Sequence, residues 1–140
     1  MWKSALLLVF AMSMATAEGQ HPVLAIGAQA PDFALPGVDG RIHKLIDYAS
    51  SPVLVVVFTS NHCPIAQMYE QRILQLTEDY KRKGVGVVAI QPNGPHAILI
   101  EELDSPDMSE SLPEMKLRAQ CKHLDYPYLY DGETKQVSRA

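Results

Sequence analysis

Residues 53–64 read Val53-Leu54-Val55-Val56-Val57-Phe58-Thr59-Ser60-Asn61-His62-Cys63-Pro64. The apolar run 53–58 predicts a fully buried β-strand, and the amphipathic pattern that begins at Pro64 predicts a helix. Cys63 is therefore expected at a helix N-terminus, where the helix dipole favours the thiolate over the thiol. Because the thiolate is the nucleophilic form of cysteine, this position indicates redox chemistry; the alternative is a buried, inert cysteine.

The predicted helix extends from Pro64 to about Lys83, and Gly84 ends it. Its apolar face is expected to comprise Ile65, Met68, Tyr69, Ile73, Leu76 and Tyr80, whereas Glu70, Arg72, Glu78, Asp79 and Lys81 fall mostly off that face. Val85 to Ile90 is a second apolar run and predicts another buried strand. Two buried strands joined by a helix form a βαβ unit, and hence a parallel sheet.

Shorter elements are expected on both sides of this unit. Residues 33–35 and 42–45 flank a turn that contains Asp39-Gly40, which predicts a β-hairpin. Ser111-Leu112-Pro113-Glu114 is a capping-box signature for a helix to about His123. Residues 126–130 predict a third strand, and Thr134 to Ala140 resembles the start of a helix at which the chain stops. This ending suggests a domain that is incomplete at its C-terminus.

The first 17 residues have the pattern of a secretory signal peptide. A positive start is followed by an apolar stretch from Ala5 to Met14 and by the small residues Ala15-Thr16-Ala17. The apolar stretch is well short of the roughly 20 residues that span a bilayer. The sequence therefore predicts export to a periplasmic or extracellular compartment, without stable membrane insertion after cleavage. One domain is expected over residues 18–140.

Composition narrows the classes of function. The chain has 140 residues, of which 47% are hydrophobic and 20% charged, as in a soluble globular protein. A net charge of −4 and the lack of a basic stripe argue against a nucleic-acid partner. Residues 93–112 include Glu101, Glu102, Asp104, Asp107 and Glu110 without one Lys or Arg. This acidic connection is expected to be a solvated loop, with a docking surface for a basic partner as the alternative.

Taken together, these elements resemble the thioredoxin-like redoxins of the peroxiredoxin (alkyl hydroperoxide reductase/thiol-specific antioxidant) group. The resemblance covers residues 26–140 and rests on Ile26-Gly27-Ala28-Gln29-Ala30-Pro31-Asp32-Phe33-Ala34-Leu35, Asp39-Gly40 and Asn61-His62-Cys63-Pro64, with support from residues 85–90 and 126–131. It implies an α/β thioredoxin-like fold. In this fold a central, mainly parallel sheet is flanked by helices and preceded by a β-hairpin. The C-terminal part of the fold is expected to lie beyond the end of this sequence.

The resemblance implies that Cys63 attacks a peroxide or a disulfide, with Ser60, Asn61, His62 and Pro64 shaping its surroundings. The sequence departs from both family patterns. Thioredoxins have Cys-x-x-Cys, but Ala66 occupies the position of the second cysteine. Peroxiredoxins have Pro-x-x-x-Thr/Ser-x-x-Cys, in which Ser60 matches and Val56 replaces the proline. The cis-proline loop and the peroxide-polarising arginine of these families are expected beyond Ala140.

Cys121 is the second cysteine of the chain. It shares a predicted helix face with Leu117 and Leu124, so a small core residue is the default interpretation. The resemblance offers another role, since some peroxiredoxins place a resolving cysteine on this helix. Cys121 would then form a disulfide with the sulfenic acid of Cys63.

The sequence leaves two functions in competition. The first is a thiol-dependent peroxidase or thiol-disulfide oxidoreductase, with a peroxide or disulfide substrate and a thioredoxin-like or other thiol reductant. The second is an exported thioredoxin-fold binding or scaffold module without turnover, which the replacement of a second cysteine by Ala66 favours. No cofactor is expected, and no metal site, because no second ligand accompanies His62 and Cys63 at a usual metal-binding spacing.

Overall fold

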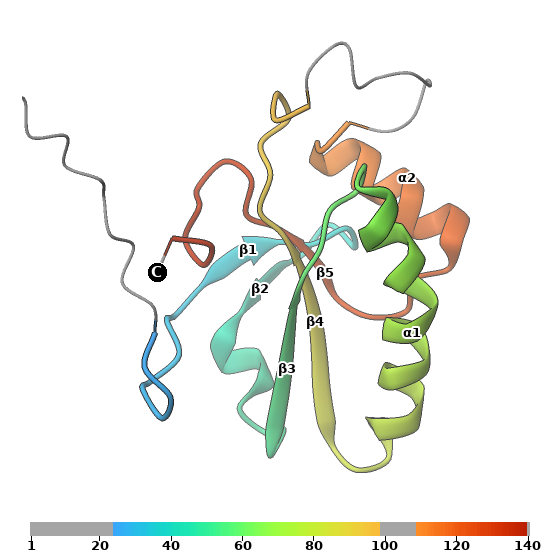
Figure 1. The fold of residues 1–140 in the computed structure, drawn as a ribbon. Helices are drawn as coiled ribbons and strands as arrows, with labels where there is room; N and C mark the ends of the chain where they lie inside the picture. Colours follow the sequence, from blue (N-terminus) through green and yellow to red (C-terminus); the bar gives the residue numbers. More distant parts are fainter. Residues whose placement is uncertain (1–23, 99–108, 140) are drawn as a thin grey trace, which may run out of the picture.

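A computed structural model describes residues 24–98 and 109–139 (Figure 1). Its elements are β1 (Ala34–Pro36), β2 (Ile42–Lys44), the short 3-10 helix η1 (Leu45–Tyr48), β3 (Val53–Phe58), α1 (Pro64–Lys81), β4 (Val85–Gln91), α2 (Leu112–Lys122) and β5 (Tyr128–Tyr130). β1 and β2 form an antiparallel hairpin, and β3, β4 and β5 form a parallel sheet in that order. The predicted βαβ unit, parallel sheet and N-terminal hairpin are thereby confirmed.

β4 is the central strand of the parallel sheet, and it is buried on both faces. Val53 pairs with Val85 and Phe58 with Ile90 on one side, while Ala89 pairs with Tyr128 on the other. Successive side chains of a strand point to opposite faces. One core is therefore formed by Val87 and Ala89 with Ile73, Met115, Tyr126, Tyr128 and Tyr130, and the other by Val88 and Ile90 with Phe33, Leu35 and Leu129.

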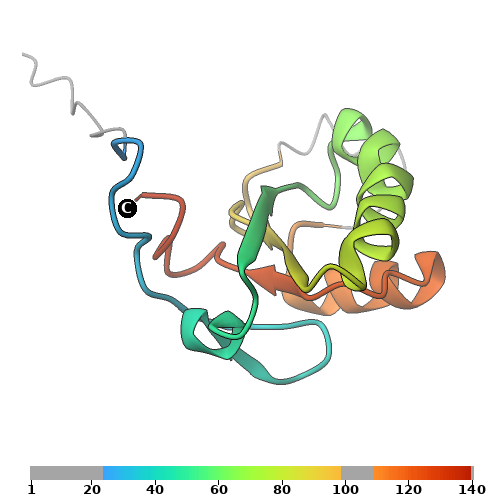
Figure 2. The same cartoon turned by 90° about the horizontal axis from the view of Figure 1, so that it is seen from below.

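The helices and the hairpin lie on opposite sides of the parallel sheet, as Figures 1 and 2 show. The turn of the hairpin is joined to β5, because the Val38 amide donates to the Tyr128 carbonyl at 3.0 Å and Gly37 forms an antiparallel bridge to Leu129. Both helices begin beyond the carboxyl ends of the strands, at the top of Figure 1. In open parallel sheets this edge is where functional groups gather.

Two predictions about burial are wrong. β3 is not fully buried: Val53 and Phe58 are each 52% exposed, because within the described residues β3 pairs with β4 alone. The predicted apolar face of α1 is largely exposed as well, with Met68 at 72%, and of its members only Ile73 is buried. The periodicity located the helix correctly but did not identify the face that packs on the sheet.

Glu70, predicted to lie off the packed face of α1, is buried. Its carboxylate accepts a hydrogen bond at 2.6 Å from Nε of Arg118, which is buried on α2. This ion pair fastens the two helices to each other beside the sheet. Paired, hydrogen-bonded charges are the form in which charged side chains are tolerated in a protein interior.

The start of α2 and the segment that follows β5 both differ from the prediction. Ser111 is the N-cap of α2, but its side chain makes no capping bond and its hydroxyl instead accepts from that of Ser109 at 2.9 Å. Residues 132–139 form turns rather than the start of a helix. The buried carboxylate of Asp131 holds these turns, since it accepts from the amides of Gln136, Val137 and Ser138.

Some predictions fall outside the described residues. These are the signal peptide over 1–17 and the acidic residues Glu101, Glu102, Asp104 and Asp107. No helix in the described part of the chain is long and apolar enough to cross a membrane.

Candidate active site

Cys63 is the N-cap residue of α1, as predicted, and its side chain is partly exposed. It has an extended backbone with φ −62° and ψ 117°, and its carbonyl accepts the first helical hydrogen bond from Gln67 at 3.0 Å. Pro64 follows in the first helical turn, where its missing N–H costs nothing. The sulfur therefore lies at the positive end of an 18-residue helix, beyond the carboxyl end of β3.

Glu110 lies beneath the segment 60–62, which connects β3 to Cys63. The residue is only 2% exposed, and its carboxylate accepts four hydrogen bonds. The donors are the Ser60 hydroxyl, the Asn61 amide at 2.9 Å, the His62 amide at 3.1 Å and Nε2 of Gln91 at 2.5 Å. The two ion pairs of the described residues do not include Glu110, so neutral donors alone surround its carboxylate.

Ser60 connects this carboxylate to Cys63. Its hydroxyl donates to Glu110, and its oxygen accepts from the Cys63 backbone N–H at 3.1 Å. A serine hydroxyl has one proton. In this arrangement that proton is directed at Glu110, so Ser60 acts toward Cys63 as an acceptor at the amide and not as a donor at the sulfur.

Further side chains hold the segment from both ends. Nε2 of Gln67, in the first turn of α1, donates to the carbonyls of Asn61 at 3.0 Å and His62 at 3.3 Å. The Asn61 side-chain amide donates to the Ser109 carbonyl at 2.9 Å, beside Glu110. The segment is thus tied to α1 and to the residues that precede α2, and its conformation does not depend on β3 alone.

Four buried polar atoms gather at this edge of the sheet without a hydrogen-bond partner in the described structure. They are Oδ1 of Asn61, Nδ1 of His62, Oε1 of Gln91 and the hydroxyl of Tyr130. Burial and the nearby carboxylates of Glu133 and Glu110 raise the pKa of Tyr130, which keeps its hydroxyl neutral. Buried polar groups without a partner are rare in native proteins.

Cys121 lies at the far end of α2 from the residues that contact the Cys63 segment. It lies in the last turn of α2 and is exposed, so the prediction of a small core residue is wrong. Ten residues separate it from Ser111, or about 15 Å along the helix axis. Both cysteines are free thiols in this structure.

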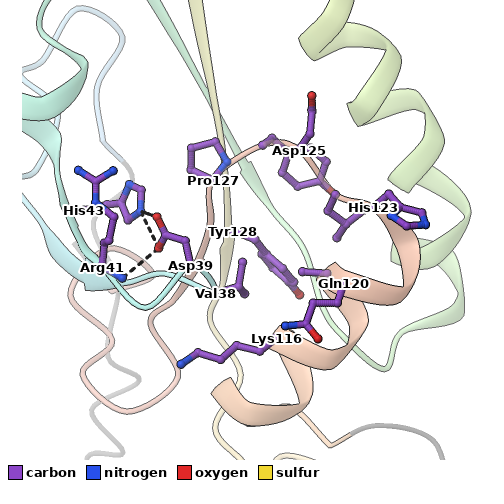
Figure 3. A pocket seen from close by; sticks show the side chains of 13 residues that line it. Val38, Asp39, Arg41, His43, Lys116, Gln120, His123, Asp125, Pro127 and Tyr128 are labelled. Atoms are coloured by element: carbon purple, nitrogen blue, oxygen red, sulfur yellow. Dashed lines mark hydrogen bonds and ion pairs between the residues drawn. The ribbon is translucent and has the colours of Figure 1, made fainter.

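A separate open cavity of about 770 Å³ lies between the hairpin turn, α2 and β5 (Figure 3). His43 bridges Asp39 at 3.0 Å and the Tyr48 hydroxyl at 3.1 Å on one wall. Burial opposes ionisation of Asp39, but hydrogen bonds from the Arg41 amide and from His43 outweigh it and lower the pKa of this carboxyl. Neither Cys63 nor Glu110 lines the cavity, so it is not part of the cysteine site.

The described residues contain no group of three or more His, Cys, Asp or Glu side chains placed to hold a metal ion. The buried polar groups near Cys63 are amides, hydroxyls, the Nδ1 atom of His62 and one carboxylate. The site therefore offers a thiol on a backbone segment that hydrogen bonds hold in place.

The parallel sheet, the N-terminal hairpin and the cysteine at the N-cap of α1 define a thioredoxin-like fold. Residues 26–140 match the AhpC/TSA family, and the chain belongs to that family. The family matches the one that the sequence resembles, and it places the chain among the redoxins.

Individual proteins are similar to the chain in sequence or in fold. The chain is 31% identical over 76 residues to the thiol-disulfide oxidoreductase ResA of Geobacillus thermodenitrificans, covering 54% of this chain and 43% of that protein. An uncharacterized conserved protein from Geobacillus kaustophilus has 36% identity and a TM-score of 0.68, over 86% of this chain and 57% of its own. A thiol:disulfide interchange protein of the thioredoxin family from Chlorobium tepidum shares the fold, at 21% identity and a TM-score of 0.55, over 72% and 58%. The chain thus spans roughly half of each relative's length.

The sequence-predicted residues Ser60, Asn61, His62, Cys63 and Pro64 form one continuous segment of the site. Sequence reasoning missed Gln91 and Glu110. The expectation of a solvated acidic loop is wrong for Glu110, which is buried. In the nearby sequence, only its position directly before Ser111, the N-cap of α2, could have indicated that Glu110 is buried. Nothing in that stretch connects it to Ser60, 50 residues earlier.

Proposed function

We propose that this protein is a thiol-dependent oxidoreductase in which the Cys63 thiolate attacks a peroxide or a disulfide. One observation carries the proposal: in a chain of the AhpC/TSA family, Cys63 is the partly exposed N-cap residue of α1. A helix N-terminus favours the thiolate, and partial exposure gives a small substrate access to the sulfur.

With a hydroperoxide, the thiolate attacks one peroxide oxygen. An S–O bond forms as the O–O bond breaks, sulfur is oxidised to the sulfenic acid, and the second oxygen leaves as an alcohol or water after taking up a proton. An external thiol then displaces water from the sulfenic sulfur and forms a mixed disulfide. A second thiol reduces that bond and returns Cys63 to its starting state.

With a disulfide substrate, the thiolate attacks one of the two sulfurs. A mixed disulfide forms with Cys63, and the other sulfur leaves as a thiolate. Ala66 in α1 provides no neighbouring thiol to complete the exchange. A thioredoxin-like or other external thiol therefore serves as the reductant in both reactions.

We further propose that the protein works after export, in a periplasmic or extracellular compartment, because residues 1–17 have the pattern of a cleaved signal peptide. N-terminal sequencing of the protein recovered outside the cytoplasm is expected to begin at Glu18. A sequence that begins at Met1 would contradict export by cleavage.

A binding module without turnover is the second candidate. The side chains of Ile65, Met68 and Tyr69 are exposed on α1 directly after Cys63, and this apolar surface suits a protein partner. Such a module needs no reactive thiol. The reactivity of Cys63 therefore separates the two candidates.

The deciding experiment compares wild type, Cys63→Ser and Cys121→Ser with hydrogen peroxide and with an aromatic disulfide, using dithiothreitol as reductant. The rate without protein is subtracted, because dithiothreitol reduces an aromatic disulfide directly. We expect Cys63→Ser to lose the protein-dependent turnover of both substrates and Cys121→Ser to retain it. Protein-dependent turnover in Cys63→Ser at the wild-type rate would refute the assignment. A wild type whose Cys63 reacts with both probes no faster than exposed Cys121 would favour the binding module.

A further inference from the structure

The carboxylate of Glu110 is completely satisfied by donors. Oε1 accepts from the Ser60 hydroxyl and the His62 amide, and Oε2 accepts from the Asn61 amide and Gln91. An ionised carboxylate has about four acceptor sites and no proton to donate. Four donors fill these sites, and an amide at this position would turn its NH₂ hydrogens toward two of them.

Three of these donors belong to the segment that presents Cys63. They are the hydroxyl of Ser60 and the backbone amides of Asn61 and His62, which lie between the end of β3 and the N-cap of α1. Gln91, at the end of β4, supplies the fourth donor and also donates to the Glu110 carbonyl at 2.7 Å. Glu110 thus fixes the segment against the central strand of the sheet.

We propose that Glu110 is a positioning residue for Cys63. It acts through Ser60: by taking the single hydroxyl proton, it leaves the Ser60 oxygen to accept the Cys63 backbone N–H. The backbone conformation of Cys63 at the N-cap then depends on a carboxylate two hydrogen bonds away. The direction in which the Cys63 side chain points from the helix end depends on it as well. The inference rests on the proposed role of Cys63 as the nucleophile.

Glu110→Gln is the informative substitution because it keeps the size of the side chain. Its NH₂ group replaces one acceptor oxygen, so two of the present donors would face another donor. Loss of these contacts should shift the segment, and with it the Cys63 sulfur. A misplacement of a reacting group by about 1 Å can slow a reaction up to about 100-fold, and a smaller shift should slow it less. Ser60→Ala removes the same connection from its other end.

The test measures the second-order rate constants of Cys63 with hydrogen peroxide and with an aromatic disulfide. All variants carry Cys121→Ser, so that only one thiol reacts, and circular dichroism confirms that each is folded at the temperature used. We expect Glu110→Gln and Ser60→Ala each to slow Cys63 about tenfold. Because both substitutions break one connection, the double variant should be no slower than the slower single variant, to within about twofold.

Two further variants separate positioning from a general loss of stability. Glu78→Gln removes one exposed carboxylate from the far end of α1 and should leave the rate constants unchanged. Ser60→Thr retains the hydroxyl and should restore most of the rate lost in Ser60→Ala. If Glu110→Gln does not fold, the comparison of Ser60→Ala with Ser60→Thr decides the question, because equal rates in those two variants would overturn the inference.

The outcomes distinguish this inference from the function on which it rests. A reactive wild type with unchanged rates in Glu110→Gln and Ser60→Ala would overturn the positioning role and leave the nucleophile in place. A double variant slowed by the product of the two single effects would overturn it too, since the residues would then act independently. A wild type in which Cys63 is no faster than Cys121 would refute the proposed function and this inference together.

Discussion

The hydroxyl oxygen of Ser60 lies 3.1 Å from the backbone nitrogen of Cys63 and accepts its hydrogen bond, so the two side chains leave the same turn of the chain. Their spacing is that of a Cys-x-x-Cys motif with serine at its first position. We expect Ser60→Cys to form a disulfide with Cys63 on mild oxidation. The product should lose two hydrogens in mass and yield a crosslinked peptide on digestion.

Ser60→Cys has a matched control in Ala66→Cys. Ala66 follows Cys63 at the spacing of the thioredoxin motif, but inside α1 rather than before it. In the Cys121→Ser background, Ser60→Cys tests whether a thiol three residues before Cys63 can reach its sulfur, and Ala66→Cys tests the same for a thiol three residues after it. Persistence of two free thiols in Ser60→Cys after oxidation would show that the segment is held too rigidly by Glu110 for the sulfurs to meet.

The buried ion pair between Glu70 and Arg118 provides a prediction about stability. Breaking such a pair leaves one unpaired charge in the interior, at a cost of about 3–5 kcal/mol. Glu70→Gln should therefore lower the free energy of unfolding strongly, while Glu78→Gln on the exposed part of α1 should change it by less than about 0.5 kcal/mol. Urea denaturation followed by circular dichroism measures both.

A double replacement separates the pair's net contribution from the penalty of an orphaned charge. Glu70→Leu with Arg118→Met removes both charges and retains much of the volume, so it should recover most of the stability lost in Glu70→Gln. A double variant as unstable as the single variant would mean that the ion pair itself stabilises the packing of the two helices, and that the loss in Glu70→Gln is not due to an unpaired charge alone.

Sequence patterns located the elements of this fold better than their environments. The apolar runs gave β3 at residues 53–58 and β4 to within one residue of its end, because strand formation follows local composition. Burial is a tertiary property, and the predictions of burial were wrong where burial depends on contacts with other elements. Glu70 is buried because Arg118 approaches it from α2, and Met68 is exposed because no described element covers it.

The same distinction holds for the candidate site. Residues 60–64 were predictable because their chemistry lies within one strand-to-helix junction. Glu110 was not, since its four contacts are made across the fold, to Gln91 at a separation of 19 residues and to Ser60 at 50. An acidic stretch usually faces solvent, and only packing against the sheet reveals which of its carboxylates turns inward.

The separation of the two cysteines predicts how oxidised Cys63 is reduced. Cys121 lies at the opposite end of α2 from the residues that contact the Cys63 segment, and a disulfide needs Cα atoms within about 7 Å. We expect Cys121→Ser to be reduced by an external thiol at the wild-type rate. Mass spectrometry of the peroxide-treated wild type should show sulfenic acid, trapped by dimedone, at Cys63.

A Cys63–Cys121 crosslink that forms in the folded protein would contradict this prediction and support a resolving role for Cys121. Repeating the oxidation in increasing urea identifies the origin of any crosslink. A bond that appears only as α2 begins to unfold reports local opening rather than the native arrangement.

Asp131 provides a prediction about pH. Burial opposes its ionisation, but hydrogen bonds from the Ser138 amide, the Thr134 hydroxyl and the amides of Val137 and Gln136 outweigh that effect and lower its pKa below the ordinary value of 3.8. A carboxyl whose pKa is lower in the folded than in the unfolded state stabilises the fold above the unfolded pKa. That contribution is lost as the pH falls through the folded pKa.

Asp131→Asn should therefore lower the free energy of unfolding by about 1–3 kcal/mol at pH 7, since its amide group would face the backbone donors of residues 136–138. The difference from wild type should shrink below about pH 4 as the wild-type carboxyl becomes protonated. Urea midpoints from pH 3 to 7 measure this, with exposed Asp125→Asn as the control. A deficit that stays constant over the whole range would locate the effect in the shape of the side chain and not in its charge.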